Sequence, residues 1–179
     1  CKIHIRSEDR ELVSINAFSY RENAVNILLG ESGIGKTLIS KALYGLLDPQ
    51  ELFVEIDGRP YSAYLQSERT KTIRRNSFFV FQEPSSHLNP LLRLREQLRE
   101  GSISGLENEK AILEFLWDNK DLSYTDKILD VYPKPYRPSG GEKQRILIAM
   151  AFKKILRFFK TVHAASANLF VFDEPSGNL

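Results

Sequence analysis

The feature that most constrains this fold is a glycine-rich loop between a short apolar run and a helix-like segment. It matches the pattern G-x-x-x-x-G-K-[ST] and consists of Gly30, Glu31, Ser32, Gly33, Ile34, Gly35, Lys36 and Thr37. We expect the apolar run Ala24–Leu29 to form a buried strand and residues 38–47 to form a helix. A strand, a glycine loop and a helix in succession predict an α/β protein that binds phosphate at this loop.

The physical reason lies in the backbone. Glycine tolerates positive φ, so the loop can turn tightly around a phosphate. Backbone N–H groups then point inward, and the start of the following helix adds its partial positive charge. Lys36 would reach the outer phosphates and the Thr37 hydroxyl would bind Mg²⁺. The motif alone indicates a nucleotide phosphate and leaves the chemistry open.

Strands and helices alternate along the rest of the chain, which favours an α/β class. We expect antiparallel strands at Lys2–Arg6 and Glu11–Tyr20, and buried strands at Phe78–Phe81 and Leu169–Phe172. Leu91–Gly105 is charged and Leu-spaced, as in a surface helix. The block 85–138 holds no convincing strand, so we expect a helical subdomain inserted into a core made of residues 1–84 and 139–179.

Two acids directly follow the expected strand Leu169–Phe172. Ligands of open α/β sheets bind at the carboxyl edge of the strands, where Asp173 and Glu174 would lie. One or two carboxylates are the usual protein ligands of Mg²⁺, so Asp173 is the candidate metal ligand and Glu174 the candidate general base. A solvated acidic turn would be the preferred interpretation if the phosphate loop were absent.

A second glycine pair opens the long helix expected over residues 141–160. Ser139 can cap this helix, and the N–H groups of Gly140 and Gly141 would make a second anion site. One nucleotide does not need two such sites on one chain, so the second site would serve the nucleotide of another subunit. An ordinary serine-capped helix is the alternative.

The order and spacing of these segments resemble the nucleotide-binding domain of ABC ATPases. Residues 30–37 resemble the Walker A motif, Gln82 the Q-loop, 139–144 the signature, 170–174 the Walker B motif, and 176–179 the start of the D-loop. The resemblance implies a RecA-like P-loop core that binds ATP and Mg²⁺. It also implies a head-to-tail dimer of two ATP-binding domains and transmembrane permease subunits as partners.

Residue roles follow from the same resemblance. Glu174, Gln82 and Lys36 would be catalytic, and Thr37, Gln82 and Asp173 would hold the metal. Ser139, Gly140 and Gly141 would complete the site of the opposite protomer. The stretch 81–90 is similar to peptide and nickel importer ATPases, whereas residues 173–179 are also similar to lipoprotein-releasing and macrolide-exporter ATPases. We therefore expect a peptide/nickel-type importer subunit, cytoplasmic and peripheral on the inner face of the membrane.

Several sequence features bear on the alternatives. Net charge is +2, too small to favour nucleic acid as a partner, and a DNA-repair ABC ATPase would need a long coiled coil between the glycine motifs. Pro138 replaces the leucine usual before the signature. The chain stops before the family's remaining D-loop, next strand and switch histidine. We therefore expect a C-terminally truncated domain, marginally stable and nearly inactive alone, and a non-catalytic nucleotide switch stays an alternative.

Overall fold

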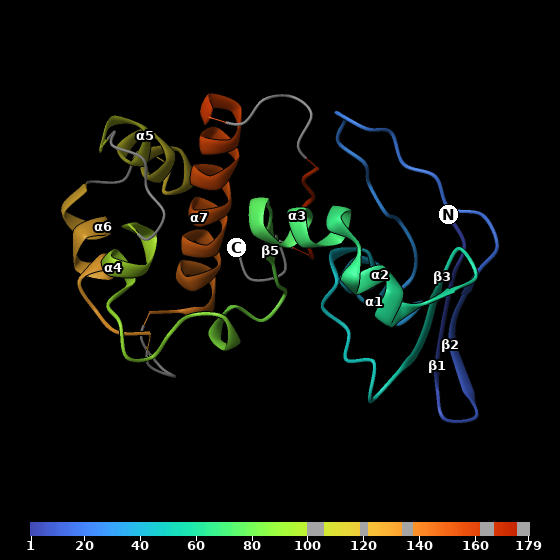
Figure 1. Ribbon diagram of the computed structural model, residues 1–179. Coiled ribbons are helices and arrows are strands. Elements are labelled where there is room, and N and C mark those ends of the chain that lie inside the picture. Colours follow the sequence, from blue (N-terminus) through green and yellow to red (C-terminus); the bar gives the residue numbers. More distant parts are fainter. Residues whose placement is uncertain (100–105, 119–121, 134–137, 162–166, 175–179) are drawn as a thin grey trace. The chain divides into compact units, whose positions relative to one another are not determined.

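The computed structural model describes residues 1–99, 106–118, 122–133, 138–161 and 167–174. The chain divides into two compact units, residues 1–75 and residues 76–179. We refer to them as unit 1 and unit 2 and describe each by itself (Figure 1).

Unit 1 contains an antiparallel sheet in the order β2-β1-β3-β4. Ile3 pairs with Ile15 of β2 and Ile56 of β3, so alternate apolar residues share one face of the sheet. Five of these side chains are almost completely buried, which is why this register is favoured: Ile3, Ile5, Val13, Val54 and Ile56. The strands are β1 (Ile3–Ser7), β2 (Arg10–Ile15), β3 (Phe53–Ile56) and β4 (Arg59–Pro60).

The phosphate-loop helix α1 (Lys36–Tyr44) packs on this sheet through Ile39 and Ala42. It ends at Gly45, whose φ of 88° is the left-handed conformation that glycine accepts at a helix C-terminus. The hydroxyl of Tyr61 donates to Ala42 O at 3.0 Å, and that of Tyr64 donates to Leu43 O at 2.5 Å. These phenols add hydrogen bonds to carbonyls in the last turn of α1, where Ala42 O also accepts the Gly45 N–H at 3.2 Å.

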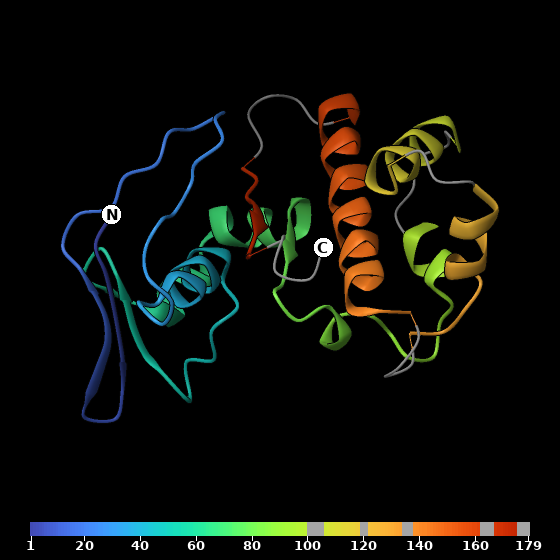
Figure 2. The same ribbon diagram turned by 180° about the vertical axis from the view of Figure 1, so that it is seen from behind.

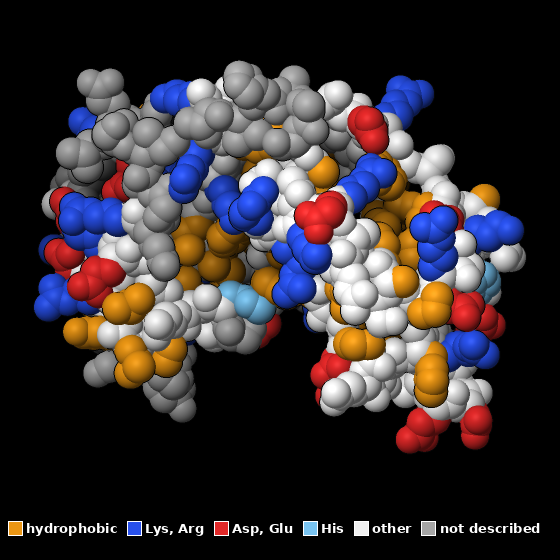
Figure 3. Space-filling view, in the orientation of Figure 1, with side chains coloured by type: hydrophobic (Ala, Val, Ile, Leu, Met, Phe, Trp, Pro, Cys, Tyr) orange, Lys and Arg blue, Asp and Glu red, His pale blue; other side chains and the backbone are white. Residues whose placement is uncertain are grey.

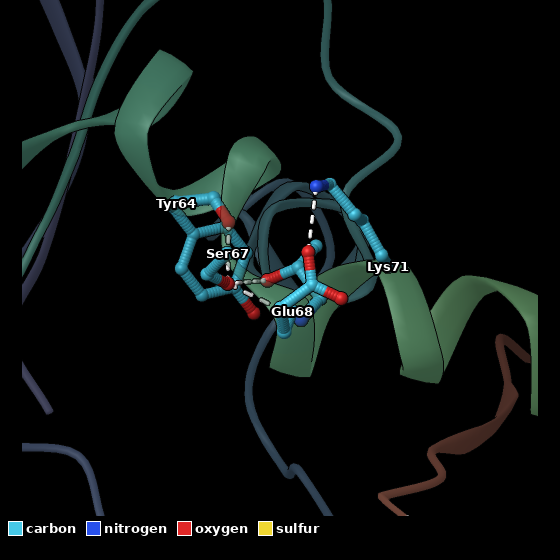
Figure 4. Close-up of polar contacts among 5 residues, drawn as sticks. Tyr64, Ser67, Glu68 and Lys71 are labelled. Atoms are coloured by element: carbon cyan, nitrogen blue, oxygen red, sulfur yellow. Dashed lines mark hydrogen bonds and ion pairs between the residues drawn. The ribbon is translucent and has the colours of Figure 1, made fainter.

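The two tyrosines belong to α2 (Tyr61–Gln66), which is followed by α3 (Glu68–Asn76). Figure 4 shows the junction, where the Ser67 hydroxyl donates to Tyr64 O at 2.8 Å and accepts from the Thr70 N–H at 3.2 Å. Lys71 pairs with Glu68 at 2.8 Å on the same short helix. Residues 61–76 are therefore helical, with a break at Ser67.

The buried strand expected at Ala24–Leu29 is wrong for this structure. The segment is extended chain without strand pairing, and three of its side chains are mostly exposed: Val25 (92%), Ile27 (78%) and Leu29 (85%). A strand needs a neighbour to complete its hydrogen bonds, and no strand among the described residues pairs with this segment. An apolar run indicates that a segment favours burial, but it does not specify the neighbouring strand with which the segment would pair.

Unit 2 is arranged around its long helix α7 (Gly140–Thr161). Figures 1 and 2 show strands β5 and β6 on one side of α7 and the shorter helices on the other. The two strands pair in parallel, with Phe78 opposite Phe170 and Val80 opposite Phe172. The elements are β5 (Phe78–Val80), the 3₁₀ turn η1 (Pro84–Ser86), α4 (Leu94–Arg99), α5 (Leu106–Leu116), α6 (Leu122–Leu129) and β6 (Phe170–Phe172).

Helix α4 begins three residues later than the surface helix expected over Leu91–Gly105, and it is more buried. Leu94 and Leu98 are 0% and 1% exposed, because they pack into the core of unit 2 with α7. Arg95 ties this helix to α6 by ion pairs with Asp126 at 2.8 Å and Asp130 at 2.7 Å. Residues 100–105 of the expected helix lie outside the described residues.

Hydrophobic side chains also gather at the surface beside α4 and α6 (Figure 3). We call this the α4–α6 apolar surface. Its two segments are joined by a hydrogen bond from Leu94 N to Val131 O at 3.0 Å. It comprises Leu91 (82% exposed), Leu92 (37%), Val131 (37%) and Tyr132 (41%). In the described part of the chain, no helix is both long and apolar enough to cross a membrane.

Candidate functional site

The phosphate loop of unit 1 is organised by its own lysine. The Lys36 ammonium donates to Gly30 O at 2.9 Å and to Glu31 O at 2.8 Å, which curls the loop back over the start of α1. Gly33 and Gly35 have φ values of 84° and 99°, where a side chain would be strained. The loop residues 30–34 are exposed, so their backbone groups are accessible to an anion.

The backbone of Gly35 lies so close to the sheet of unit 1 that a side chain would not fit at this position. A Cβ atom at this position would lie 2.5 Å from Val13 Cγ2 of β2. The Gly35 carbonyl also accepts the Ile39 N–H at 2.9 Å, which begins the hydrogen bonding of α1. The loop is thus fixed at its C-terminal end by β2 and by α1, as a preorganised anion site requires.

The acids of unit 2 lie where the sequence places them, at the carboxyl end of β6. Asp173 is 8% exposed and donates its N–H to Val80 O at 2.9 Å, which continues the β5–β6 pairing. Gln82 follows β5, and its side-chain amide donates to Glu174 Oε2 at 2.7 Å. Parallel pairing therefore brings Gln82, Asp173 and Glu174 to one edge, although 92 residues separate Gln82 from Glu174.

Ser139 begins α7 with a capping box, a reciprocal pair of side-chain to backbone hydrogen bonds. Its hydroxyl accepts the Glu142 N–H at 3.3 Å, and its own N–H donates to Glu142 Oε2 at 2.7 Å. The expected N-cap role of Ser139 is confirmed. Gly140 and Gly141 form the first turn of α7 behind it, so their N–H groups belong to the positive end of a 22-residue helix.

Tyr124 of α6 also contacts this helix start. Its hydroxyl donates to Glu142 Oε1 at 2.7 Å. Burial acts to raise the pKa of the Glu142 carboxyl, but the hydrogen bonds from Tyr124 and Ser139 outweigh it and lower that pKa. The same bond to Glu142 raises the pKa of the Tyr124 hydroxyl. Glu142 is therefore held as a carboxylate at neutral pH, anchored on both oxygens.

The residues that sequence reasoning did not single out are Lys143 and Gln144. Both lie in the first turns of α7 and are 2% and 1% exposed. Lys143 Nζ donates to Ser85 Oγ at 3.1 Å, and Gln144 Nε2 donates to Phe81 O at 3.2 Å. Their signal in the sequence is a lysine and a glutamine directly before the apolar stretch of a helix. Residues 176–179, which resemble the start of a D-loop, lie outside the described residues.

Two lysines late in α7, Lys153 and Lys154, make contacts within unit 2. Lys153 forms an ion pair with Glu109 of α5 and donates to Leu98 O at 2.6 Å. Lys154 lies over the Phe78 ring at 6.0 Å, and burial lowers the pKa of its ammonium group. These two contacts favour an amphipathic helix over a basic contact surface for this stretch.

A glycine loop that begins a helix, acids at the end of a parallel strand and a second glycine-opened helix define a phosphate-loop nucleotide-binding protein. Comparison with known families agrees: the model of the family described as ABC transporter matches residues 14–176. The chain belongs to the ABC transporter family, as its ATP-binding domain. The predicted α/β P-loop fold with an antiparallel N-terminal sheet is confirmed.

Individual relatives cover nearly all of the chain. It is 28% identical over 186 residues to the dipeptide transport ATP-binding protein DppD of Escherichia coli K12, covering 97% of this chain and 52% of DppD. It is 32% identical over 157 residues to the nickel import ATP-binding protein NikE of Escherichia coli O6:K15:H31, covering 85% and 52%. The chain thus spans about half the length of the curated relatives that it matches.

Solved structures share the fold at lower identity. One is a dimeric post-hydrolysis state of the ATP-binding cassette MJ0796 bound to ADP and Pi, with a TM-score of 0.54 and 22% identity, covering 96% of this chain and 88% of that chain. Another is a bacterial Atm1-family ABC exporter with ATP bound, with a TM-score of 0.59 and 18% identity, covering 96% and 34%. At these identities the likeness concerns the fold.

Proposed function

We propose that this chain hydrolyses ATP as the ATP-binding subunit of an ABC transporter. The observation that carries the proposal is the hydrogen bond of 2.7 Å between Gln82 and Glu174 beside Asp173, in a chain that also holds a phosphate loop. Assigning the phosphate loop and these acids to one nucleotide rests on the family pattern. Lys36 would bind the outer phosphates, and Glu174 would accept a proton from the attacking water.

The proposed metal ligands have the chemistry that a magnesium-bound nucleotide requires. Mg²⁺ prefers oxygen ligands and uses few protein carboxylates, and Thr37, Gln82 and Asp173 supply a hydroxyl, an amide oxygen and one carboxylate. These three residues would hold the ion, which neutralises phosphate charge when bound. Among the described residues, no cluster of three or more His, Cys, Asp or Glu side chains offers a competing metal site.

The second half of the proposal is a head-to-tail dimer. Ser139, Gly140 and Gly141 would bind the nucleotide held by a second ATP-binding domain, since helix N-termini bind phosphate. Support comes from the solved structure of the cassette MJ0796, a dimer bound to ADP and Pi. The Ser139 hydroxyl accepts from Glu142 N in the structure, so contact with a partner's phosphate would have to share or replace that bond.

We also propose import of peptides or nickel as the transport function, at the cytoplasmic face of the membrane. DppD and NikE, whose names describe dipeptide transport and nickel import, support it. The α4–α6 apolar surface is the proposed docking site of the permease subunit, because exposed apolar patches mark interaction sites. Adjacent reading frames encoding multi-span membrane proteins and a binding protein would support this assignment, and their absence would count against it.

The alternatives make different demands. A DNA-repair ABC ATPase needs a long coiled coil between Thr37 and Ser139, whereas the described helices there are short, the longest being α5 with 11 residues. A non-catalytic switch would bind ATP but release no phosphate. Hydrolysis measurements therefore separate the switch from the enzyme.

The decisive experiment is Glu174→Gln in the full-length protein. Loss of a general base should lower the rate of phosphate release by about 10²–10⁴-fold while ATP binding persists, and ATP should then trap a dimer visible by light scattering. Glu114→Gln, which changes a partly exposed carboxylate of α5 outside the proposed site, is the matched control. A Glu174→Gln protein that hydrolyses at the wild-type rate and stays monomeric with ATP would refute the mechanism.

A further inference from the structure

Two consecutive polar residues of α7 are buried without a role in binding nucleotide. Lys143 and Gln144 are 2% and 1% exposed, one turn after Ser139. Lysine is almost never fully buried unless it is paired, and a buried amide is costly without hydrogen bonds. Their presence at the start of the signature helix therefore needs a physical reason.

That reason lies in the segment that carries Gln82. Gln144 Nε2 donates to Phe81 O, immediately before Gln82, and Lys143 Nζ donates to Ser85 Oγ, three residues after it. Adjacent residues of one helix thus hold both ends of the segment 81–85. Neither hydrogen bond is made by Gln82 itself, whose side-chain amide donates to Glu174.

The Gln82 segment is also closed on itself. The Glu83 carboxylate accepts the Ser85 N–H at 3.0 Å, and the Phe81 ring stacks on His87 with centroids 3.3 Å apart and planes 9° from parallel. Together with the hydrogen bond from His87 N to Pro84 O at 3.2 Å, these contacts restrict the conformations open to residues 81–87. Fixing its two ends therefore fixes where the Gln82 amide points.

The Gln82 segment also contacts Glu174, the second of the two acids after β6. Gln82 Nε2 reaches Glu174 Oε2 at 2.7 Å. Hydrogen bonds consequently connect the capping box of Ser139, through the first turns of α7 and the Gln82 segment, to Glu174. All of these residues belong to unit 2.

We propose that Gln144 and Lys143 are positioning residues that couple the signature end of α7 to Gln82. Engagement of Ser139 by a nucleotide shifts the start of α7, and the two side chains carry that shift to the Gln82 segment and so to the bond with Glu174. This inference rests on the proposed ATPase function and adds a route by which the dimer interface regulates the same site.

The hydrogen bonding of the Gln144 amide suggests that its contact with the Gln82 segment can change. In the described part of the structure, its Oε1 atom is buried and accepts no hydrogen bond. Buried polar groups are normally satisfied, so an unsatisfied acceptor weakens this arrangement relative to one in which a donor is supplied. We would expect a glutamine with a purely structural role to form hydrogen bonds through both the nitrogen and the oxygen of its side-chain amide.

The test compares Gln144→Met with Gln97→Met in the full-length protein. Gln97 is also buried and also bonds a loop, donating to Asn89 O and Leu92 O at 3.0 Å each, but it does not contact the Gln82 segment. We expect Gln144→Met to lower kcat about tenfold, since small misplacement of reacting groups costs up to about 10²-fold. KM for ATP should change little, and Gln97→Met should leave kcat near the wild-type value.

A double-mutant comparison gives the second readout. In a Gln82→Ala background, adding Gln144→Met should cause no further loss of kcat, because the group being positioned is gone. Additive losses, or an equal loss from Gln97→Met, would overturn the inference. Ser85→Ala, on the exposed loop, removes the Lys143 contact without altering α7, and it should lower kcat in the same direction if Gln144→Met fails to fold.

Hydrogen exchange separates failure of this inference from failure of the proposed function. Backbone amides of residues 81–87 should exchange faster in Gln144→Met and at the wild-type rate in Gln97→Met, whether or not ATP is hydrolysed. A wild-type protein without ATPase activity would refute the proposed function alone. Unchanged exchange over 81–87 in Gln144→Met would refute the positioning role even in an active enzyme.

Discussion

A largely buried ion pair in unit 2 leads to a testable stability prediction. Lys153 of α7 and Glu109 of α5 have side chains that are 14% and 11% exposed, and they are paired with each other. Lys153 also donates to Leu98 O at 2.6 Å. Replacing Lys153 by Met therefore leaves one carboxylate without its buried cation and one buried carbonyl without its donor. The methionine keeps most of the apolar packing.

Removing one partner of a buried ion pair costs about 3–5 kcal/mol, a large part of the 5–15 kcal/mol of stability typical of a domain, stated as an order of magnitude. With a urea slope of about 2 kcal/mol/M, the unfolding midpoint should fall by about 1.5–2.5 M. Lys153→Met together with Glu109→Leu should recover most of this loss, because no unpaired charge remains.

The control is Lys110→Met, which breaks an exposed pair with Glu114 at 3.7 Å on α5. Exposed helix pairs contribute about 0.3–0.5 kcal/mol, so its midpoint should barely move. If Lys153→Met costs no more than Lys110→Met, or if the double variant is no more stable than Lys153→Met, the burial argument fails.

Two further predictions concern unit 1. Gly35→Ala should abolish ATP binding in a fluorescent-nucleotide titration and lower stability by about 1–2 kcal/mol, because φ is 99° and the new Cβ would meet Val13; normal binding would contradict this. Burial raises the pKa of Tyr44 and Tyr61 to about 12. Since the unfolded pKa is about 10, their stabilisation is complete below pH 10 and is lost as pH rises toward 12. Urea midpoints measured from pH 9 to 12 should fall accordingly, and less in Tyr61→Phe; equal falls would refute the assignment.

The sequence predicts the local motifs of this chain better than the contacts between residues that are far apart in the sequence. The glycine loop, the capping of α7 by Ser139 and the acids after β6 are determined by residues within a few positions of one another, so short patterns identify them. The apolar runs also predict β5 and β6 as strands, whereas their pairing with each other is seen only in the structure. Contacts such as Lys143 with Ser85 join positions 58 residues apart, and no pattern at either position specifies the other.

The segment Ala24–Leu29 shows the limit most clearly. Its apolar run has the composition of an inner strand, yet Val25 is 92% exposed. Periodicity reports which side chains favour burial, whereas burial of a strand also requires hydrogen-bonding neighbours. Among the described residues, the sheet of unit 1 ends at β2 and β4 and the sheet of unit 2 holds only β5 and β6. The predicted buried strand is therefore wrong, although the loop that follows the segment keeps its turn.

The backbone at Glu174 links the geometry of the acid to the Gln82 segment. Its φ of 45° lies in the left-handed region, which costs a residue with a side chain about 1–2 kcal/mol. Such strain persists only when neighbouring contacts impose it. Here the preceding residue, Asp173, is fixed to Val80 O, and the Glu174 carboxylate is held by Gln82. The proposed base is therefore tethered in a strained position, and any movement of Gln82 that breaks the tether also removes a restraint on that strain. The proposed positioning of Gln82 by α7 therefore also bears on the backbone conformation of Glu174, because the Gln82–Glu174 hydrogen bond joins the two.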